Sequence, residues 1–330
     1  MAARVRGVVL RPSSRGDRWH RWVNSEAIAA YAFLLPNLLG FVVFTALPVV
    51  ASLCLSFYDW DIIRWPPRFV GLGNFIQLVG WHREGMRWLP NDPLFWKFIY
   101  NTMFLMLGIP LNMLGSLMLA WLLNQRLKGL VWFRTTFFLP TISSGVAIAL
   151  LWTWLYNPEF GPVNQALEEA GRFLQVPLRG PHWLTDPAWA KPALMLMGFW
   201  TMMGGYNMVL YLAALQGIPK ELYESAEIDG AGAWRKFWHI TWPMISPTTF
   251  FILTMSIIGG FQGGFLNAYV MTRGGPHGAT TTIEYYIFNQ LYAYQHAGYA
   301  AAIAWLLFLG VLLVTLFHWR AGGRWVFYGA

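Results

Sequence analysis

Six long stretches of this 330-residue chain contain no Asp, Glu, Lys or Arg. Crossing about 30 Å of hydrocarbon takes about 20 helical residues, and each stretch is longer than that. Only 12% of the residues are charged, about half the share of a soluble domain, so too little charge remains to cover six buried helices in water. The sequence therefore predicts an all-α integral membrane protein with six transmembrane helices, whose backbone groups are satisfied internally. The charge-free stretches are 27–58, 98–125, 135–158, 192–219, 237–272 and 285–319.

The expected organisation is one membrane domain, 27–320, between a basic tail at 1–26 and a short tail at 321–330. An even number of spans places both chain ends on one side of the membrane. The segments on that side carry 14 Lys and Arg, against 9 in the opposite segments, which predicts cytoplasmic N and C termini. Within the domain we expect the spans at about 27–58, 98–125, 135–158, 192–219, 245–272 and 297–319.

The net charge of +8 has two readings, a nucleic-acid surface or a membrane orientation signal. The excess lies entirely on the predicted cytoplasmic side, which favours contact with anionic membrane lipids and no nucleic-acid partner. The single cysteine, Cys54, excludes a disulfide framework and a CxxC metal or redox motif. No predicted span contains a charged residue, which argues against an ion-coupled carrier.

The segment between the fourth and fifth spans, 219–243, is a loop dense in charged residues. Pro219 suits the first turn of a helix, acidic residues follow it, and Gly230 is expected to end that helix. A second helix presents apolar residues at three- to four-residue spacing: Trp234, Phe237, Trp238 and Ile240. These features predict a short helix–turn–helix along the membrane surface, which either rests on lipid headgroups as a connector or docks against another protein.

The same segment resembles the EAA loop of the permease subunits of binding-protein-dependent ABC importers. The family pattern reads Glu-Ala-Ala, two residues, Asp-Gly-Ala, and then Trp, Phe, Ile and Leu-Pro at set distances. Ser225 replaces the middle alanine and Trp242 replaces the leucine, and both changes are conservative. The resemblance assigns ATPase coupling to Glu224, Ser225, Ala226, Asp229, Gly230 and Ala231.

The resemblance covers roughly 28–58 and 95–320, and Thr272–Pro276 looks like the carbohydrate-uptake branch that includes maltose and glycerol-3-phosphate importers. It implies the type I importer permease (MetI-like) fold in the inner or plasma membrane of a bacterium or archaeon. The chain looks like the first permease of a heterodimeric pair. The implied partners are a second permease subunit, a homodimeric cytoplasmic ATPase that Glu224 contacts through an ionic interaction, and an extracytoplasmic solute-binding protein.

The chain contains no GxxxxGK[ST] motif and therefore has no P-loop of its own. We expect no cofactor, no metal site and no catalytic residue in this chain, with ATP-Mg bound by the partner ATPase. The alternative from a different class is an integral membrane lipid-modifying enzyme. Such an enzyme needs a nucleophilic or charged cluster at a membrane face, and the EAA-like loop is a dense charged cluster that the resemblance assigns to ATPase coupling.

Uncharged polar and aromatic residues in the spans are candidates for a substrate pathway near the bilayer midplane. Amides hydrogen-bond hydroxyl groups and aromatic faces pack against C–H surfaces, which favours a neutral mono-, di- or oligosaccharide, with glycerol-3-phosphate or another polyol as the alternative. Taken singly, each residue has the competing role of bonding a neighbouring helix. Gln262 lies in a glycine-rich run that is expected to break its helix beside a cavity. The candidates are Trp200, Tyr206, Asn207, Ser256, Gln262 and Asn267.

Overall fold

The computed structural model describes residues 26–61, 63, 66–125 and 128–327. The expected basic tail therefore lies outside the described residues, except for Glu26. The chain divides into two compact units, 1–54 and 55–330. In the first unit, three helical segments follow one another without a break: α2 (Glu26–Phe41), the π-helical η1 (Val42–Ala46) and α3 (Leu47–Leu55). The last residue of α3, Leu55, is the first residue of the second unit. Its 26-residue stretch Ala30–Leu55 is long and apolar enough to cross a membrane.

The second unit opens with two small antiparallel sheets around a short helix. They are made by β1 (Tyr58–Asp59) with β2 (Arg68–Phe69), and by β3 (Trp81–Glu84) with β4 (Arg87–Pro90), with α4 (Gly73–Val79) between them. The chain is mostly helical, as expected, and these hairpins are an addition that the sequence interpretation did not include. Among the described residues, the strands lie within 58–90, where polar residues and turn formers interrupt helical periodicity.

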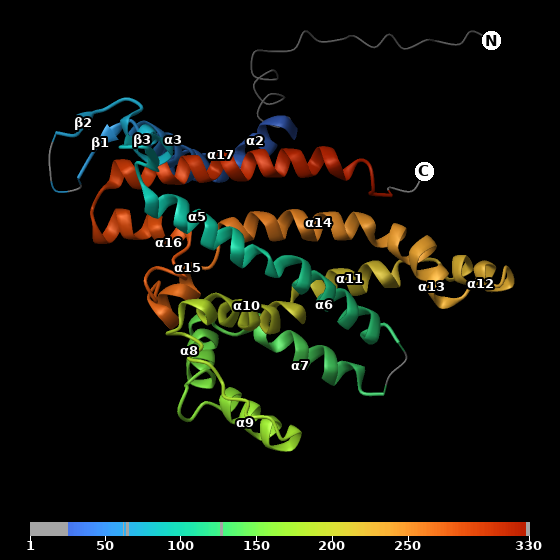
Figure 1. Ribbon diagram of the computed structural model, residues 1–330. Helices are drawn as coiled ribbons and strands as arrows, with labels where there is room; N and C mark the ends of the chain where they lie inside the picture. The colour runs from blue at the N-terminus through green and yellow to red at the C-terminus, as the bar shows by residue number, and fades with distance from the viewer. Residues whose placement is uncertain (1–25, 62, 64–65, 126–127, 328–330) are drawn as a thin grey trace, which may run out of the picture. The chain divides into compact units, whose positions relative to one another are not determined.

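The long helices of the second unit run between its two ends (Figure 1). α5 (Pro93–Met106) and α6 (Gly108–Leu123) together form one 31-residue candidate span. α14 (Trp242–Phe261) belongs to a second candidate span that begins at Ala233, and α17 (Ala297–Gly322) is a third. At one end lie α12 (Lys220–Ile228), α13 (Ala233–Lys236) and the π-helical η2 (Phe237–Thr241). At the other end lie α15 (Phe265–Asn267), η3 (Ala268–Thr272), α16 (Ile283–Phe288) and η4 (Asn289–Ala293).

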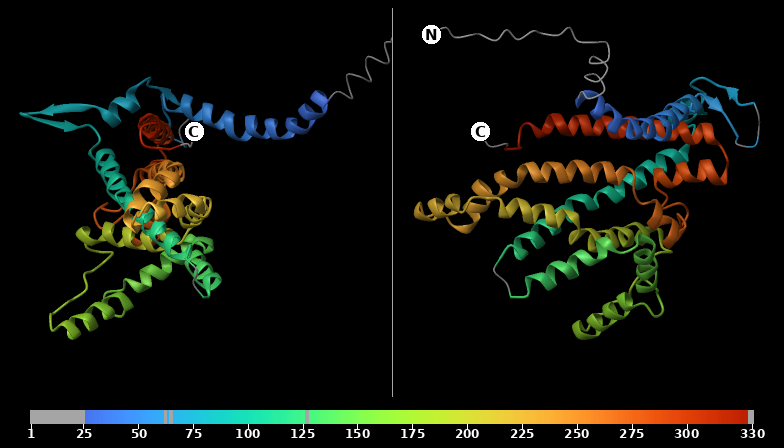
Figure 2. Two further views of the ribbon diagram at one scale, coloured as in Figure 1. Left: turned by 90° about the vertical axis from the view of Figure 1, so that its right-hand side faces the viewer. Right: turned by 180° about the vertical axis from the view of Figure 1, so that it is seen from behind.

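Two of the expected spans are bent. α7 (Leu130–Ile142) and α8 (Gly145–Leu155) meet at 99°, and α10 (Pro187–Met203) and α11 (Tyr206–Gln216) meet at 41°. At the second bend, a Cβ on Gly204 would lie 2.1 Å from the Phe137 carbonyl oxygen, so only glycine allows α7 to approach this closely. Between the bent pairs, α9 (Pro162–Leu174) projects away from the other helices of the unit (Figure 2).

Within the described residues, four helices are long and apolar enough to span a membrane, or up to six if each bent pair is one span. The prediction of a helical membrane protein is confirmed at this level. Three buried apolar clusters hold the second unit together: one joins α6, α11 and α14, one joins α8 and α10, and one joins α4, α5, α16 and α17. Helices of the first two clusters, α6, α10, α11 and α14, also line one cavity.

Candidate functional site

The segment 219–243 forms the predicted pair of short helices at one end of the second unit (Figure 1). α12 begins directly after Pro219, which is its N-cap, and carries Glu221 in its first turn. A carboxylate is favourable there because the N-terminus of a helix carries partial positive charge. Sequence and structure therefore agree on where this helix starts.

α12 ends in a Schellman motif. The Ala231 amide donates to the Ala226 carbonyl at 2.8 Å, and the Gly230 amide donates to the Glu227 carbonyl at 3.0 Å. Gly230 has a φ of 73°, the left-handed conformation that this motif requires after the last helical residue. The prediction that Gly230 ends the first helix is confirmed, and the backbone itself fixes the turn.

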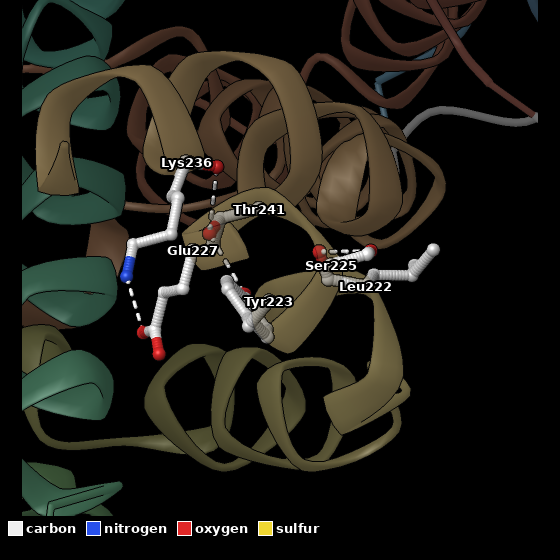
Figure 3. A network of polar contacts seen from close by, with 6 residues as sticks. All are labelled: Leu222, Tyr223, Ser225, Glu227, Lys236 and Thr241. Atoms are coloured by element: carbon white, nitrogen blue, oxygen red, sulfur yellow. Dashed lines mark hydrogen bonds and ion pairs between the residues drawn. The ribbon is translucent and has the colours of Figure 1, made fainter. Parts of the chain in front are cut away.

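Two side-chain contacts join α12 to the second helix (Figure 3). The hydroxyls of Tyr223 and Thr241 are hydrogen-bonded at 2.8 Å, and the Lys236 ammonium pairs with a Glu227 carboxylate oxygen at 2.7 Å. Ser225 donates its hydroxyl back to the Glu221 carbonyl at 2.8 Å, within its own helix. The serine hydroxyl is thus satisfied internally, which explains how serine replaces the small alanine of the family pattern at little cost.

The outward surface of this segment is acidic among small side chains. Glu224 and Asp229 are exposed, and neither carboxylate forms an ion pair or a side-chain hydrogen bond with any residue that the structure describes. Ala226 and Ala231 are half-buried on the same segment, and Trp234 beyond them is 73% exposed. An unpaired carboxylate next to small residues can accept hydrogen bonds from an approaching Arg or Lys at close range.

A second feature is a cavity of about 490 Å³ between α5, α6, α10, α11 and α14. Ligand pockets in proteins are commonly about 300–1,000 Å³, so this volume suits a small solute. The break between α14 and α15 forms part of the wall through Gly263 and Gly264. The cavity brings together four of the six residues predicted for a substrate pathway: Tyr206, Asn207, Ser256 and Asn267.

The other two predicted pathway residues are not among those lining the cavity. Trp200 packs edge-on against Trp152, with ring centroids 5.7 Å apart. Gln262 caps the end of α14 and is exposed. The expected helix break at the glycine-rich run is present. The residues of this run that line the cavity are the glycines on either side of Gln262.

Five polar residues that the sequence interpretation missed also line the cavity: Thr102, Asn112, Thr141, Thr201 and Thr282. The buried Oδ1 atom of Asn112 and the buried Oγ1 atom of Thr141 have no hydrogen-bond partner among the described residues. The Asn112 amide nitrogen donates only to the Met202 sulfur, at 3.7 Å. Both oxygen atoms are therefore able to form hydrogen bonds with a polar group that enters the cavity. The available signal was an amide and a hydroxyl inside apolar stretches, which does not by itself reveal the face they occupy.

A buried polar cluster lies at the opposite end of the second unit from α12. Asp92 caps α5 by accepting from the Leu94 and Phe95 amides, and its other oxygen accepts from the hydroxyls of Tyr286 at 2.7 Å and Tyr299 at 2.6 Å. Burial, then the hydrogen bond and charge of Asp92, raise the pKa of Tyr286. No three His, Cys, Asp or Glu side chains of the described residues converge as metal ligands, so we interpret this cluster as a structural tie.

Comparisons with known proteins agree with these features. The family model described as binding-protein-dependent transport system inner membrane component matches residues 92–320. The chain is 33% identical to the probable ABC transporter permease protein YesP of Bacillus subtilis, over 93% of this chain and 94% of that protein. It is 35% identical to the lactose transport system permease protein LacF of Rhizobium radiobacter, over 89% and 94%. A solved bacterial ABC transporter involved in the import of the acidic polysaccharide alginate contains a chain that superposes with a TM-score of 0.74 at 25% identity, covering 94% of this chain and 98% of that chain.

Proposed function

The chain belongs to the family of binding-protein-dependent transport system inner membrane components, and on that premise we propose that it conducts a sugar across the membrane. Family membership makes it a multi-pass permease subunit in the inner membrane of a prokaryote. It is a transport component, and ATP is handled by a partner ATPase. The coupling surface, the partner subunits and the substrate are proposals, each supported by a separate observation.

The proposed coupling surface is the outward face of α12 and its Schellman turn. The support is that Glu224 is exposed without an internal partner, beside the small residues Ala226 and Ala231. We place this surface in a cleft of a cytoplasmic ATPase dimer, where Glu224 meets a cation. This placement puts α12 in the cytoplasm, and with it the N and C termini, in agreement with the distribution of Lys and Arg.

The remaining proposed partners are a second permease subunit and an extracytoplasmic solute-binding protein. The family name itself implies a binding protein. Support for a second permease comes from the cavity, whose wall includes Tyr206 at 67% exposure and Met255 at 53%. A substrate pathway needs a closed wall, and a second permease is the natural partner to complete it.

The single observation that carries the sugar assignment is the cavity with the unpaired Asn112 and Thr141 oxygens. Sugar hydroxyls both donate and accept hydrogen bonds, so they can satisfy an amide oxygen and a threonine hydroxyl together. Tyr206, Asn207, Ser256 and Asn267 add further polar and aromatic groups to the same wall. A glycerol phosphate or another polyol shares the hydroxyl chemistry and remains the alternative substrate class.

The test is sugar uptake by the complete importer in proteoliposomes, after co-purification has identified the second permease and the ATPase. Thr141→Val removes one hydroxyl at nearly constant volume, and Asn112→Leu removes the amide. Each should raise the half-saturating sugar concentration about fivefold to tenfold, because a hydrogen bond contributes about 1 kcal/mol or more. Gln262→Ala is the matched polar control outside the cavity wall. Unchanged uptake in both cavity variants contradicts the site, and failure to transport any sugar contradicts the substrate class.

A further inference from the structure

Lys191 lies near the start of α10 and is not itself among the residues that line the cavity. It precedes Leu194 and Met195, which line the cavity, by about one helical turn. Its ammonium donates to Asn101 Oδ1 at 3.1 Å and lies 4.8 Å from the ring centroids of both Tyr100 and Phe104. The ammonium is therefore held in a defined place between α5 and α10, with aromatic faces on one side.

A second lysine stands close by on α5. Lys97 precedes Asn101 by about one helical turn, is exposed, and donates to the His277 carbonyl at 2.5 Å. Asn101 is only 2% exposed and donates from its amide to the carbonyls of Gly278 and Thr281, each at 2.9 Å. The loop that contains these three carbonyls is thus fastened beside both lysines.

Three residues near the lysines and the attached loop, on three separate elements, line the cavity. Thr102 follows Asn101 on α5, Thr282 follows Thr281 at the end of the loop, and Leu194 lies one turn beyond Lys191 on α10. All three of these neighbours line the cavity. Lys191 is therefore about one helical turn away from the cavity wall along α10.

Neither ammonium has a carboxylate within ion-pair distance among the described residues. The carboxylates on the neighbouring elements are already engaged: Asp92 accepts from Tyr286 and Tyr299, and Glu284 accepts from the Phe265 amide. Ionisable side chains within membrane segments pair with one another or with backbone carbonyls, and they commonly mark a substrate path. The ammonium groups of Lys97 and Lys191 are therefore available to bind an anionic ligand.

We propose that Lys191, assisted by Lys97, binds an acidic group on the transported sugar, whether a carboxylate, a sulfonate or a phosphate. The proposal rests on the proposed function and narrows its substrate class from sugars in general to acidic sugars. The sequence interpretation favoured a neutral sugar because the charge-free stretch 192–219 begins one residue after Lys191. In the folded chain, that residue is the one charged side chain of α10, and it precedes the cavity-lining Leu194 and Met195 by about one helical turn.

A purely structural role for Lys191 is the competing explanation, because it also pins Asn101. The variant Lys191→Gln separates the two, since glutamine keeps an N–H donor for Asn101 Oδ1 and loses the positive charge. Lys97→Gln is a second variant at an exposed position, where folding is not at risk. Lys128→Gln is the matched control, because Lys128 is exposed in the loop between α6 and α7, outside the cavity wall.

The experiment uses the complete importer with its binding protein in proteoliposomes. Uptake is measured for a galacturonate disaccharide, a 6-sulfo-glucose and a glucose 6-phosphate, and for a galactose disaccharide and glucose as their neutral counterparts. We expect uptake of at least one acidic sugar, with a half-saturating concentration raised about tenfold by Lys191→Gln and less by Lys97→Gln, since hydrogen bonds to charged groups are strong. Lys128→Gln should match the unaltered protein.

Each other outcome overturns the proposal in a distinguishable way. Uptake of neutral sugars alone rejects the acidic class and leaves the proposed function intact. Equal losses for acidic and neutral sugars in Lys191→Gln assign it a structural role. If both lysine variants take up the acidic sugars as well as the unaltered protein does, the lysines do not bind the acidic group. Failure of all five sugars rejects this inference together with the proposed sugar transport. If Lys191→Gln does not assemble, the Lys97→Gln uptake decides.

Discussion

The segment 219–243 and the segment 273–299 lie at opposite ends of the second unit and use their side chains in opposite ways (Figure 1). In the first, the turn is made by backbone hydrogen bonds, and Glu224, Asp229 and Trp234 remain exposed. In the second, Thr280, Thr282 and Tyr286 are at most 4% exposed. Their hydroxyls bond to the chain itself.

The difference separates a surface kept for a partner from a scaffold that shapes the cavity. A side chain without an internal partner can change with little effect on folding, but at a docking surface it strongly affects association. A buried, fully bonded side chain behaves in the reverse way, because its loss leaves the remaining groups unpaired. The comparison therefore predicts which variants lose coupling and which lose stability.

The largest effect should come from Glu224→Lys. Reversing a charge that is desolvated at a protein interface costs several kcal/mol, so ATPase association should weaken about a hundredfold or more and sugar-dependent ATP hydrolysis should be lost. The thermal midpoint of the permease should not change, because Glu224 has no bonded partner in the described chain. Co-purification of the ATPase measures the first and thermal unfolding the second.

Glu168→Lys is the control for this change. Glu168 is an exposed acid of α9 and lies outside the 219–243 segment, so the same charge reversal there should leave ATPase association unaltered. Normal coupling in Glu224→Lys, or equal losses in the two variants, would remove Glu224 from the docking surface.

Next in size is Asp92→Ala, which should lower stability without touching the coupling surface. The change leaves the hydroxyls of Tyr286 and Tyr299 without their acceptor and removes the cap of α5. We expect a loss of about 2–4 kcal/mol in the free energy of unfolding. Thermal or denaturant unfolding of the purified permease measures it.

Asp186→Ala is the matched comparison, because Asp186 also caps a helix but has only the Ala188 amide as a bonded partner. Its loss should be about 1 kcal/mol, typical of a cap alone. If both aspartate variants unfold alike, the two tyrosine contacts do not stabilise the cluster.

A smaller effect is expected from Gly230→Ala in the Schellman turn. A side chain at a φ of 73° costs about 1 kcal/mol, which should weaken ATPase association about fivefold. Gly232→Ala is the control, since Gly232 has a φ of −69° and no atom within 4 Å of an added Cβ. Equal behaviour of the two alanine variants would show that the left-handed turn is not needed for docking.

The smallest effect concerns Glu284, whose carboxylate accepts from the Phe265 amide beside the cavity wall. Burial raises the pKa of Glu284, and the hydrogen bond from Phe265 opposes that rise. A raised pKa in the folded state means that protonation favours folding, so this contribution is present at low pH and is lost as pH rises through that pKa. We therefore compare the thermal unfolding midpoint of the unaltered protein with that of Glu284→Gln. As pH falls from 7 to 4, the midpoint of the unaltered protein should rise relative to that of the variant, by less than about 2 °C. A pH-independent difference contradicts the assignment.

Much of the architecture was predictable because it depends on local composition. A charge-free stretch of more than twenty residues must form a helix in a membrane wherever its neighbours lie, since its backbone has no other partner. The first helix of the EAA-like loop was predictable for the same reason: Pro219 starts it and Gly230 ends it through backbone chemistry. The hairpins at 58–90 were not, because strand pairing joins residues that carry no local signal of each other.

The cavity was predictable only in part. Tyr206, Asn207, Ser256 and Asn267 line it as expected, while five polar residues, among them Asn112 and Thr141, were missed and Trp200 and Gln262 lie outside the wall. In helices that are apolar all round, one amide or hydroxyl does not define a face, so periodicity cannot say where it points. The 99° and 41° bends add to this, because they rotate one half of a span relative to the other.

By itself, the sequence determined that this chain crosses the membrane as helices and carries an EAA-like loop, because hydrocarbon burial and helix capping act on neighbouring residues. It also determined the family, through residues that stand at set distances along the chain. Only the tertiary structure decided which polar groups share a cavity, and that Lys191, one residue outside a charge-free stretch, is hydrogen-bonded to Asn101 between α5 and α10. Packing between helices distant in sequence makes that decision, and a one-dimensional charge map does not contain it.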